Sequence, residues 1–291
     1  MSPATRHRLR TLYGTRHGLS ALARDCAVQF GLLSGIAQLY LTFWPDSSLP
    51  RGTTLVVITG LVLVGGTLRA WPRNSISREF HNPGFAVSVE VGDLFDQPSH
   101  LVIGCNDVFD TDTQDDLLIV RRSVQGQFLH RVYGGDVPRL NAELTAALAG
   151  TVPVGVEEPS AKRAGKLARY PIGTVAVIGA PERRYFLPAY STMQNDLTVS
   201  SGVDQLWRGL GELWAAVHLY GRREALAMPI LGSDLARVDS MDHGGLIKLI
   251  LLSFVARSRE AIVCNHLTIV VHPKDYCRID MLELAAFLRT L

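Results

Sequence analysis

Polar loops that follow short apolar runs hold the side chains of this 291-residue chain that are best suited to binding chemistry. Asp93 comes two residues after the run Phe85–Val91, and Asn106 directly follows a second, shorter run. A third loop, Leu231–Asp234, follows the run Leu226–Ile230. In an α/β sheet, ligands bind beyond the carboxyl ends of the strands, so residues in these positions are expected to carry the chemistry.

The residue pattern gives little support to catalytic or metal chemistry. The four cysteines, Cys26, Cys105, Cys264 and Cys277, form no C-x-x-C pair, and no histidine lies at metal-ligand spacing from them. No nucleophile with an activating partner is evident. The formal net charge is only +2, which gives no global case for nucleic-acid binding. We therefore expect no catalytic residue, no metal, no cofactor and no nucleic-acid partner.

Each polar loop also has a plain structural interpretation. Asp93 is a suitable helix cap, Asn106 a suitable turn residue, and Gly232 a suitable turn glycine. The loop after Asn106 is acidic, and an acid cluster on a loop is usually solvated surface. Its acids are Asp107, Asp110, Asp112, Asp115 and Asp116.

Strand and helix patterns alternate from residue 85 to the C-terminus. Apolar runs predict strands at 85–91, 100–105, 174–178, 185–189, 226–230 and 266–271. Amphipathic spacing predicts helices at 137–149, 203–219, 244–258 and 277–288, and the polar segment 153–169 is expected to be a loop or a short helix. This alternation indicates an α/β domain, with a mixed central sheet flanked by helices.

Two long apolar runs precede this domain. Cys26–Trp44 has no charged residue, and a helix of that length rises about 28 Å, enough to cross a bilayer core. Leu55–Trp71 is uncharged as far as Arg69. We expect a basic N-terminal segment at 1–24, a two-helix transmembrane hairpin at 25–71, a polar linker at 72–84 and the α/β domain at 85–291.

The placement of arginines predicts the orientation of the hairpin. Five arginines precede the first run, and Arg69, Arg73 and Arg78 lie at or after the end of the second, whereas the intervening turn has only Arg51. The positive-inside rule therefore places both termini in the cytoplasm. A cleaved signal peptide and a buried helical hairpin of a soluble core are the alternatives. The late start and the length of the first run argue against the signal peptide.

Small and amide residues mark the two apolar runs. Gly31 and Gly35 have G-x-x-x-G spacing, and Gln38 lies on nearly the same helical face. Gly65 and Gly66 lie in the second run. Because small residues let membrane helices approach closely, these positions predict either a self-association surface or the contact between the two helices.

The three polar loops, in their order along the chain, resemble those of a macro domain. Gly92-Asp93 follows the first strand, Asn106 closes the second, and a Pro-x-x-Gly-Ser loop occupies 229–233. The resemblance extends from about residue 85 to the C-terminus. It implies a domain that binds ADP-ribose or a related nucleotide as its ligand.

This resemblance assigns a role to each loop. Asp93, with the Leu94 backbone beside it, would accept a hydrogen bond from the adenine amino group, and Asn106 would bond the distal ribose. Phe109 would stack on that ribose or wall it off, and the neighbouring acids would favour a cationic or hydrogen-bond-donating substituent. Two loops would hold the phosphates by backbone N–H groups. The implied ligand-binding residues are Asp93, Leu94, Asn106, Asp107, Phe109, Asp110, then Ser123, Val124, Gln125 and Gly126, and finally Leu231, Gly232, Ser233 and Asp234.

The first phosphate loop departs from the pattern of macro domains that hydrolyse ADP-ribose conjugates. Those enzymes usually carry a run of glycines there, whereas this chain has Ser123-Val124-Gln125-Gly126. The second loop also lacks a second glycine after Ser233. These departures favour a receptor over an enzyme.

Two transmembrane helices joined to such a domain, with N-D-V-F-D-T at 106–111, resemble the effector of type II Thoeris anti-phage systems. The resemblance implies that a TIR enzyme makes an ADP-ribose conjugate, histidine-linked in these systems, which binds the macro domain. It further implies a multi-pass protein of the cell inner membrane that forms a homo-oligomer and disrupts the lipid bilayer, which leads to cell death or growth arrest.

Two other functions remain open at this point. One is a membrane-anchored ADP-ribosyl hydrolase, which turnover of a conjugate would reveal. The other is a passive tether that recruits ADP-ribosylated partners to the membrane. In that case an unrelated two-helix anchor could replace residues 1–71 without loss of activity.

Overall fold

The structure, a computed structural model, describes residues 3–43, 51–233, 238 and 240–291. It divides into two compact units. The helical unit comprises Met1–Asn74 with Asp280–Thr290, and the sheet unit comprises Ser75–Ile279 with Leu291. The sheet unit therefore begins ten residues before the predicted boundary at 85.

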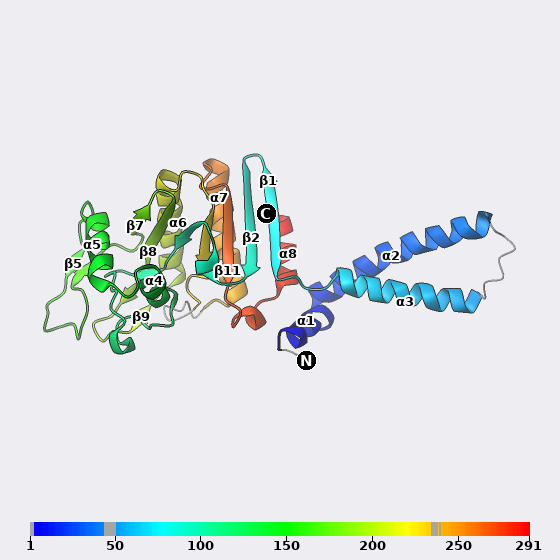
Figure 1. Ribbon diagram of the computed structural model, residues 1–291, viewed down its shortest axis with the longest axis horizontal. Coiled ribbons are helices and arrows are strands. Elements are labelled where there is room, and N and C mark those ends of the chain that lie inside the picture. The colour runs from blue at the N-terminus through cyan, green and yellow to red at the C-terminus, as the bar shows by residue number, and fades with distance from the viewer. Residues whose placement is uncertain (1–2, 44–50, 234–237, 239) are drawn as a thin grey trace. The chain divides into compact units, whose positions relative to one another are not determined.

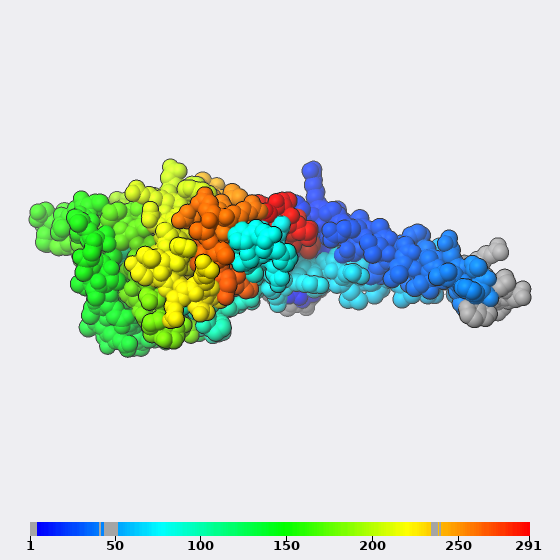
Figure 2. Space-filling view, turned by 90° about the horizontal axis from the view of Figure 1, so that it is seen from above, coloured from blue at the N-terminus to red at the C-terminus, as the bar shows by residue number. Residues whose placement is uncertain are grey.

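The helical unit contains α1 (Pro3–Gly14), α2 (Arg16–Phe43), α3 (Arg51–Arg69) and α8 (Met281–Thr290). Helices α2 and α3 lie side by side along their length (Figure 1), and the space-filling view in Figure 2 shows them in contact. A Cβ atom built at Gly65 would lie 2.1 Å from the Oε1 atom of Gln29, and one at Gly66 would lie 2.4 Å from the Sγ atom of Cys26. These two glycines therefore make the close contact between α2 and α3.

Gly31 and Gly35 of α2 lie elsewhere on the helix surface. A Cβ atom built at either position would have no described atom within 4 Å. Within the described chain, this G-x-x-x-G pair therefore does not form the contact between α2 and α3, which was one of its two interpretations. Self-association through this pair stays a prediction.

One helix among the described residues is long and apolar enough to cross a membrane, namely Gly52–Arg69, with a mean hydropathy of 1.5. The second member of the expected hairpin is the 28-residue helix α2, which contains Cys26 but ends at Phe43. Trp44 and most of the expected turn lie outside the described residues. The two-pass hairpin therefore stays a prediction.

The sheet unit is built on a mixed sheet whose strands are, in spatial order, β1-β2-β11-β10-β3-β8-β4, with β7 and β9 pairing with β8. Strands β2, β11, β10, β3, β8 and β4 run parallel to one another, whereas β1 is antiparallel to β2, and β7 and β9 are antiparallel to β8. The strands are β1 (Ser75–His81), β2 (Gly84–Val91), β3 (His100–Val102), β4 (Cys105–Asn106), β7 (Val175–Ala180), β8 (Arg183–Met193), β9 (Val199–Ser200), β10 (Leu226–Pro229) and β11 (His266–Val271).

Helices pack on both faces of this sheet. Helices α4 (Val124–Val132) and α5 (Val137–Leu148) share a buried cluster with Leu101, Ile178 and Leu187. Helices α6 (Val203–Tyr220) and α7 (His243–Glu260) contact each other, and Phe254 of α7 packs edge-on against Phe85 of β2. Alternate strand residues point to opposite faces, so both faces of the central strands are apolar and buried.

Sequence patterning predicted most of these elements. The strand at 266–271 is confirmed to the residue, and the helices at 137–149, 203–219 and 244–258 are confirmed within two residues at each end. The run at 100–105 is divided into β3 and β4, and the helix expected at 277–288 is a 3-10 turn (Tyr276–Arg278) followed by α8.

Two segment predictions were wrong. The expected linker 72–84 contains β1, whose residues Ser75–His81 pair with β2, because its Ile and Phe alternate with polar residues at an edge of the sheet. The segment 153–169, expected to be a loop or short helix, contains the two-stranded hairpin of β5 (Gly155–Val156) and β6 (Ala168–Arg169).

Leu213 and Leu219 of α6 offer a matched test of this packing. Leu213 is fully buried and Leu219 is 68% exposed. Replacing Leu213 by Ala should lower the free energy of unfolding by about 2–5 kcal/mol, because it removes buried apolar contacts and leaves a cavity. Leu219→Ala should stay within about 0.5 kcal/mol of the unaltered protein. Urea unfolding followed by tryptophan fluorescence measures both, and equal losses would contradict the assigned helix face.

Candidate functional site

The predicted ligand loops follow strands whose carboxyl ends share one edge of the sheet. Asp93 follows β2, Asn106 ends β4 and Leu231 follows β10, and all three strands run in the same direction. A Cβ atom built at Gly104 would lie 2.8 Å from the Cδ2 atom of Leu231, so the link between β3 and β4 touches the loop after β10. The structure thus gathers these loops as the sequence predicted.

Asp93 caps a short 3-10 turn, Leu94–Asp96, by accepting a hydrogen bond from the Phe95 N–H at 2.9 Å. Its other oxygen accepts a bond from Arg131 at 2.5 Å. Partial burial raises the pKa of Asp93, but the hydrogen bonds from Arg131 and from the Phe95 N–H outweigh that effect and lower the pKa below its usual value. Asp93 therefore stays an anionic acceptor. Leu94 is buried beside it.

Arg131, which the sequence reasoning did not single out, organises this end of the site. It bonds Asp93 and Asp96, and its guanidinium lies over the Phe95 ring at 4.8 Å from the centroid. Arg131 belongs to the last turn of α4, so this helix fixes the position of the Asp93 loop.

Asn106 shapes the loop that follows it. Its buried side-chain oxygen accepts hydrogen bonds from the backbone N–H groups of Val108 at 3.2 Å and Asp110 at 3.3 Å. Phe109 between them has a φ of 51°, which is uncommon for a residue other than glycine. The Phe109 ring is buried and packs edge-on against Tyr170. The role at a distal ribose that was predicted for Phe109 stays a prediction, and the structure places this ring in the core.

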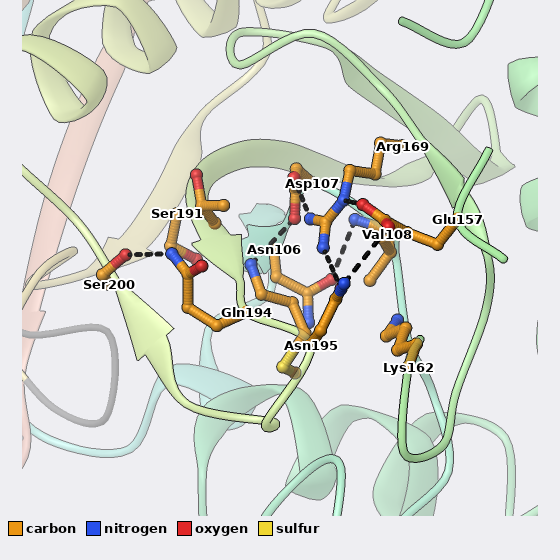
Figure 3. Close-up of polar contacts among 12 residues, drawn as sticks. Asn106, Asp107, Val108, Glu157, Lys162, Arg169, Ser191, Gln194, Asn195 and Ser200 are labelled. Atoms are coloured by element: carbon orange, nitrogen blue, oxygen red, sulfur yellow. Dashed lines mark hydrogen bonds and ion pairs between the residues drawn. The ribbon is translucent and has the colours of Figure 1, made fainter. Parts of the chain in front are cut away.

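Asp107 is buried and ties the same loop to two other elements (Figure 3). One carboxylate oxygen accepts a bond from the Met193 N–H at the end of β8, and the other accepts a bond from Arg169 of β6 at 2.7 Å. Arg169 also bonds Glu157 at 2.5 Å and Asn195 at 3.0 Å. One guanidinium thus joins three separate segments.

Asp110 is buried and contacts two lysines, Lys162 and Lys166. Its Oδ1 atom accepts the Lys166 backbone N–H at 2.8 Å, and its Oδ2 atom lies 3.6 Å from the Lys162 ammonium. Burial raises the pKa of Asp110 and lowers that of Lys166, because each charged form loses solvation. The Lys166 ammonium donates to the Phe109 carbonyl at 2.6 Å.

The acid cluster after Asn106 therefore has two parts. Asp107 and Asp110 are buried and paired, whereas Asp112, Asp115 and Asp116 are exposed. The solvated-surface interpretation fits the second part alone.

The first predicted phosphate loop is the start of α4. Ser123 is its N-cap and accepts the Gly126 N–H at 3.1 Å, and Val124 packs against the core. The Gln125 side chain donates to the Asp110 carbonyl at 2.5 Å. A Cβ atom at Gly126 would lie 2.4 Å from the Val120 carbonyl oxygen, so this position requires glycine. Helix α4 thus begins at the Asn106–Thr111 loop and ends at Asp93.

The second predicted phosphate loop starts with a buried turn. Gly232 has a φ of 81°, and its carbonyl accepts the Val238 N–H at 3.0 Å. The Ser233 hydroxyl donates to the Ile230 carbonyl at 2.7 Å, and Leu231 is buried. Asp234 lies outside the described residues.

A cavity of about 430 Å³ opens beside the Asn106–Thr111 loop. Its lining includes three acidic residues, one lysine, neutral polar residues and several apolar residues, so it offers both polar and apolar contacts to a ligand group. Of the predicted ligand-binding residues, Asp110 lines it. The lining residues are Asp110, Thr111, Asp112, Gln114, Asp115, Leu117, Leu118, Val137, Asn141, Ala164, Gly165 and Lys166.

Sequence reasoning missed the basic partners of the acidic loop, namely Lys162, Lys166 and Arg169. All three lie in the segment whose structure was wrongly predicted. A signal was present, since a run of four basic residues at 162–169 balances the acids at 107–116. Among the described residues, the grouping of metal-ligand type is His17, Asp280 and Glu283, none of which belongs to these loops.

Comparison with known proteins identifies the family. The family described as Thoeris protein ThsA, Macro domain, matches residues 87–272. Among curated proteins, no match is found.

Solved macrodomain structures from Oceanobacillus iheyensis are similar in part. The macrodomain with ADP shares 11% identity over 75% of this chain and 100% of that chain, with a TM-score of 0.47. The macrodomain with MES bound shares 13% identity over 75% and 100%, with a TM-score of 0.45. A mutant with ADPR shares 13% identity over 73% and 96%, with a TM-score of 0.43.

The raised pKa of Asp110 predicts a pH dependence of stability. Between its ordinary pKa of 3.8 and its higher value in the fold, the folded protein binds more protons at Asp110 than the unfolded chain does. Asp110 therefore makes the free energy of unfolding decrease as pH rises through that window. Asp110→Asn should remove this contribution. As pH rises, the free energy of unfolding of the variant should therefore decrease less, or increase more, than that of the unaltered protein.

Urea unfolding from about pH 4 to pH 7 measures this slope. Asp112→Asn removes a solvent-exposed carboxylate of the same loop and serves as the control. Identical slopes in the Asp110→Asn variant and the unaltered protein would contradict the assigned environment of Asp110.

Proposed function

Because the chain belongs to the family of Thoeris protein ThsA macro domains, we propose that its sheet unit is a receptor for an ADP-ribose-derived signal. The observation that carries this proposal is the family match over 87–272, which covers β10 and β11 as well as the loops that hold Asp93, Asn106 and Leu231. The gathering of Asp93, Asn106 and Leu231 along that edge supports it.

Helix α4 defines how the nucleotide lies. Asp93 at one end would accept the adenine amino group, and Asn106 at the other would orient the distal ribose. Gln125 and Arg131, which contact the two loops, are six residues apart and therefore about 9 Å apart along the helix axis. The N-terminal end of α4 and the turn at Gly232 offer N–H groups to the two phosphates between them.

The substituent on the distal ribose would enter the cavity beside the Asn106–Thr111 loop. Asp112 and Asp115 are exposed acids at its wall, so they would favour a cationic or hydrogen-bond-donating group. A histidine-linked ADP-ribose conjugate made by a TIR enzyme meets this requirement.

The hydrogen bonds that the polar side chains make within the fold favour a receptor over a hydrolase. Asn106, Asp107 and Asp110 each hold backbone or side-chain partners within the fold. A hydrolase would need a group that activates water near the distal ribose. Asn106, Asp107 and Asp110 are engaged within the fold, so among the acids that line the cavity the exposed Asp112 and Asp115 are the ones that such a reaction would have to use. Recovery of intact conjugate after incubation with the protein supports the receptor, and catalytic turnover would refute it.

The helical unit would deliver the output in the inner membrane, with both termini cytoplasmic. Helices α2 and α3 expose a broad apolar surface of a kind that soluble proteins rarely present. Its exposed large apolar residues include Val28, Phe30, Leu32, Ile36, Leu39, Phe43, Leu55, Val56, Val57, Leu61, Leu63, Val64 and Leu68. Lipid contact satisfies such a surface, and the open Gly31–Gly35 face supports association of several copies that disrupt the bilayer.

Asp93 provides the test of nucleotide binding. Replacing it by Ala removes a charged acceptor, so the affinity for ADP-ribose should fall about tenfold or more. Calorimetry with the purified protein measures the change. Asp96→Ala is the matched control, because Asp96 also pairs with Arg131 but is not assigned to adenine. Equal affinities for Asp93→Ala and the unaltered protein would show that the nucleotide binds elsewhere.

Gly31 and Gly35 provide the test of the membrane output. Replacing both by Leu adds bulk where the described chain has open space, so the helical unit should still form while close association of copies is prevented. We expect loss of cross-linked oligomers in membranes and loss of the growth arrest that the signal triggers.

Gly60→Leu in α3 is the control, because a Cβ atom there also meets no described atom within 4 Å. Exchange of residues 1–71 for an unrelated two-helix anchor separates an effector from a tether. Growth arrest that survives this exchange would contradict the effector role of the hairpin.

A further inference from the structure

Residues 157–169, here called the strap, run from the end of β5 through a turn to the end of β6. They lie across the Asn106–Thr111 loop, and Figure 3 shows Glu157, Lys162 and Arg169 of the strap around that loop. Three cations of the strap reach the loop, and each meets a different oxygen-bearing group.

Arg169 makes the first connection. Its guanidinium bonds Asp107 at 2.7 Å while it also bonds Glu157 and Asn195, and its side chain is 15% exposed. A flat guanidinium with five N–H groups can hold three partners at once, which a single ammonium cannot do in the same plane.

Lys162 and Lys166 make the second and third connections. The Lys162 side chain is fully buried and lies 3.6 Å from the Asp110 carboxylate, and its ammonium also donates to the Lys166 carbonyl at 2.5 Å. Lys166 donates to the Phe109 carbonyl at 2.6 Å through its side chain and to Asp110 at 2.8 Å through its backbone.

Gly165 brings the strap close enough for these bonds. It has a φ of 92°, and a Cβ atom there would lie 2.7 Å from the Asp110 Oδ1 atom. The turn of the strap therefore passes directly over Asp110, in a conformation that suits glycine.

The loop beneath needs such support. Phe109 adopts a positive φ, a conformation that persists when surrounding contacts fix it. Asn106 fixes the loop from within by binding two of its N–H groups, and Lys166 fixes it from outside by binding the carbonyl of Phe109 itself.

We propose that the strap is the positioning element of the ligand loop, with Lys166 as the residue that holds Asn106–Thr111 in its binding geometry. This inference rests on the proposed function, because it assigns the strap to the distal-ribose end of the same site. Lys166 acts through Phe109 and Asp110 and is therefore a positioning residue.

Lys166→Met tests the proposal, because it keeps the length of the side chain and removes the ammonium. The affinity for ADP-ribose should fall about tenfold or more, as expected for loss of a charged hydrogen bond. The affinity for AMP, which lacks the distal ribose, should be unchanged. Lys166→Arg, which keeps a cationic donor, should recover part of the ADP-ribose affinity. Arg163→Met, at an exposed strap residue, is the matched control and should bind both nucleotides normally.

Equal losses for ADP-ribose and AMP would show a general structural role and would overturn the proposal, and so would an unchanged affinity for ADP-ribose. Should Lys166→Met fail to fold, Lys166→Gln, which keeps a shorter neutral donor, takes its place with the same expected selectivity.

Hydrogen exchange of the unliganded protein tests the strap without any nucleotide. The amides of Val108, Phe109 and Asp110 should exchange faster in Lys166→Met than in Arg163→Met, while the amides of β11 stay protected. Unchanged exchange at 108–110 would refute the positioning role. Failure of the unaltered protein to bind either nucleotide would refute the proposed function and leave this exchange experiment valid.

Discussion

The ion pair between the buried Asp107 carboxylate and the partly buried Arg169 guanidinium is the interaction on which the arrangement of the candidate site depends. Removing Arg169 would leave a buried carboxylate without its charged partner, and loss of one member of a fully buried pair typically costs about 3–5 kcal/mol. Arg169 also bonds Glu157 and Asn195, and Asp107 also accepts the Met193 N–H. The ends of β4, β6 and β8 therefore take up positions that satisfy one guanidinium and one carboxylate together.

Parallel pairing explains why the predicted ligand loops emerge at one edge of the sheet. Strands β2, β11, β10, β3 and β8 run in one direction, so the residues that follow them emerge at one edge. Helix α4 then joins two of those loops, since its first turn contacts Asp110 and its last turn contacts Asp93. The length of α4 thus sets the distance between the Asp93 loop and the Asn106–Thr111 loop, and a helix is more rigid than a loop.

The sequence predicted what depends on local periodicity and not what depends on distant charge pairing. The strand at 266–271 and helix α6 follow from apolar spacing alone, and Asp93 and Asn106 follow from their place after strands. Arg131, Lys162, Lys166 and Arg169 could not be found that way, because their partners lie 38 to 62 positions away in pairs such as Arg131–Asp93 and Arg169–Asp107. Strand β1 was missed because an edge strand alternates exposed polar residues with half-buried ones and resembles a polar linker.

The chain path bears on how ligand binding in the sheet unit would be coupled to the helical unit in the proposed function. The helical unit includes residues from both ends of the chain, so the sheet unit is joined to it at Asn74–Ser75 and again at Ile279–Asp280. A ligand shifts the balance between two arrangements only by its difference in affinity for them, and a change from 1:99 to 99:1 requires about 5.5 kcal/mol. In the proposed function, a loop already in its binding geometry loses less affinity to ordering when the ligand binds, and it adds to that difference only if the two arrangements hold the loop differently.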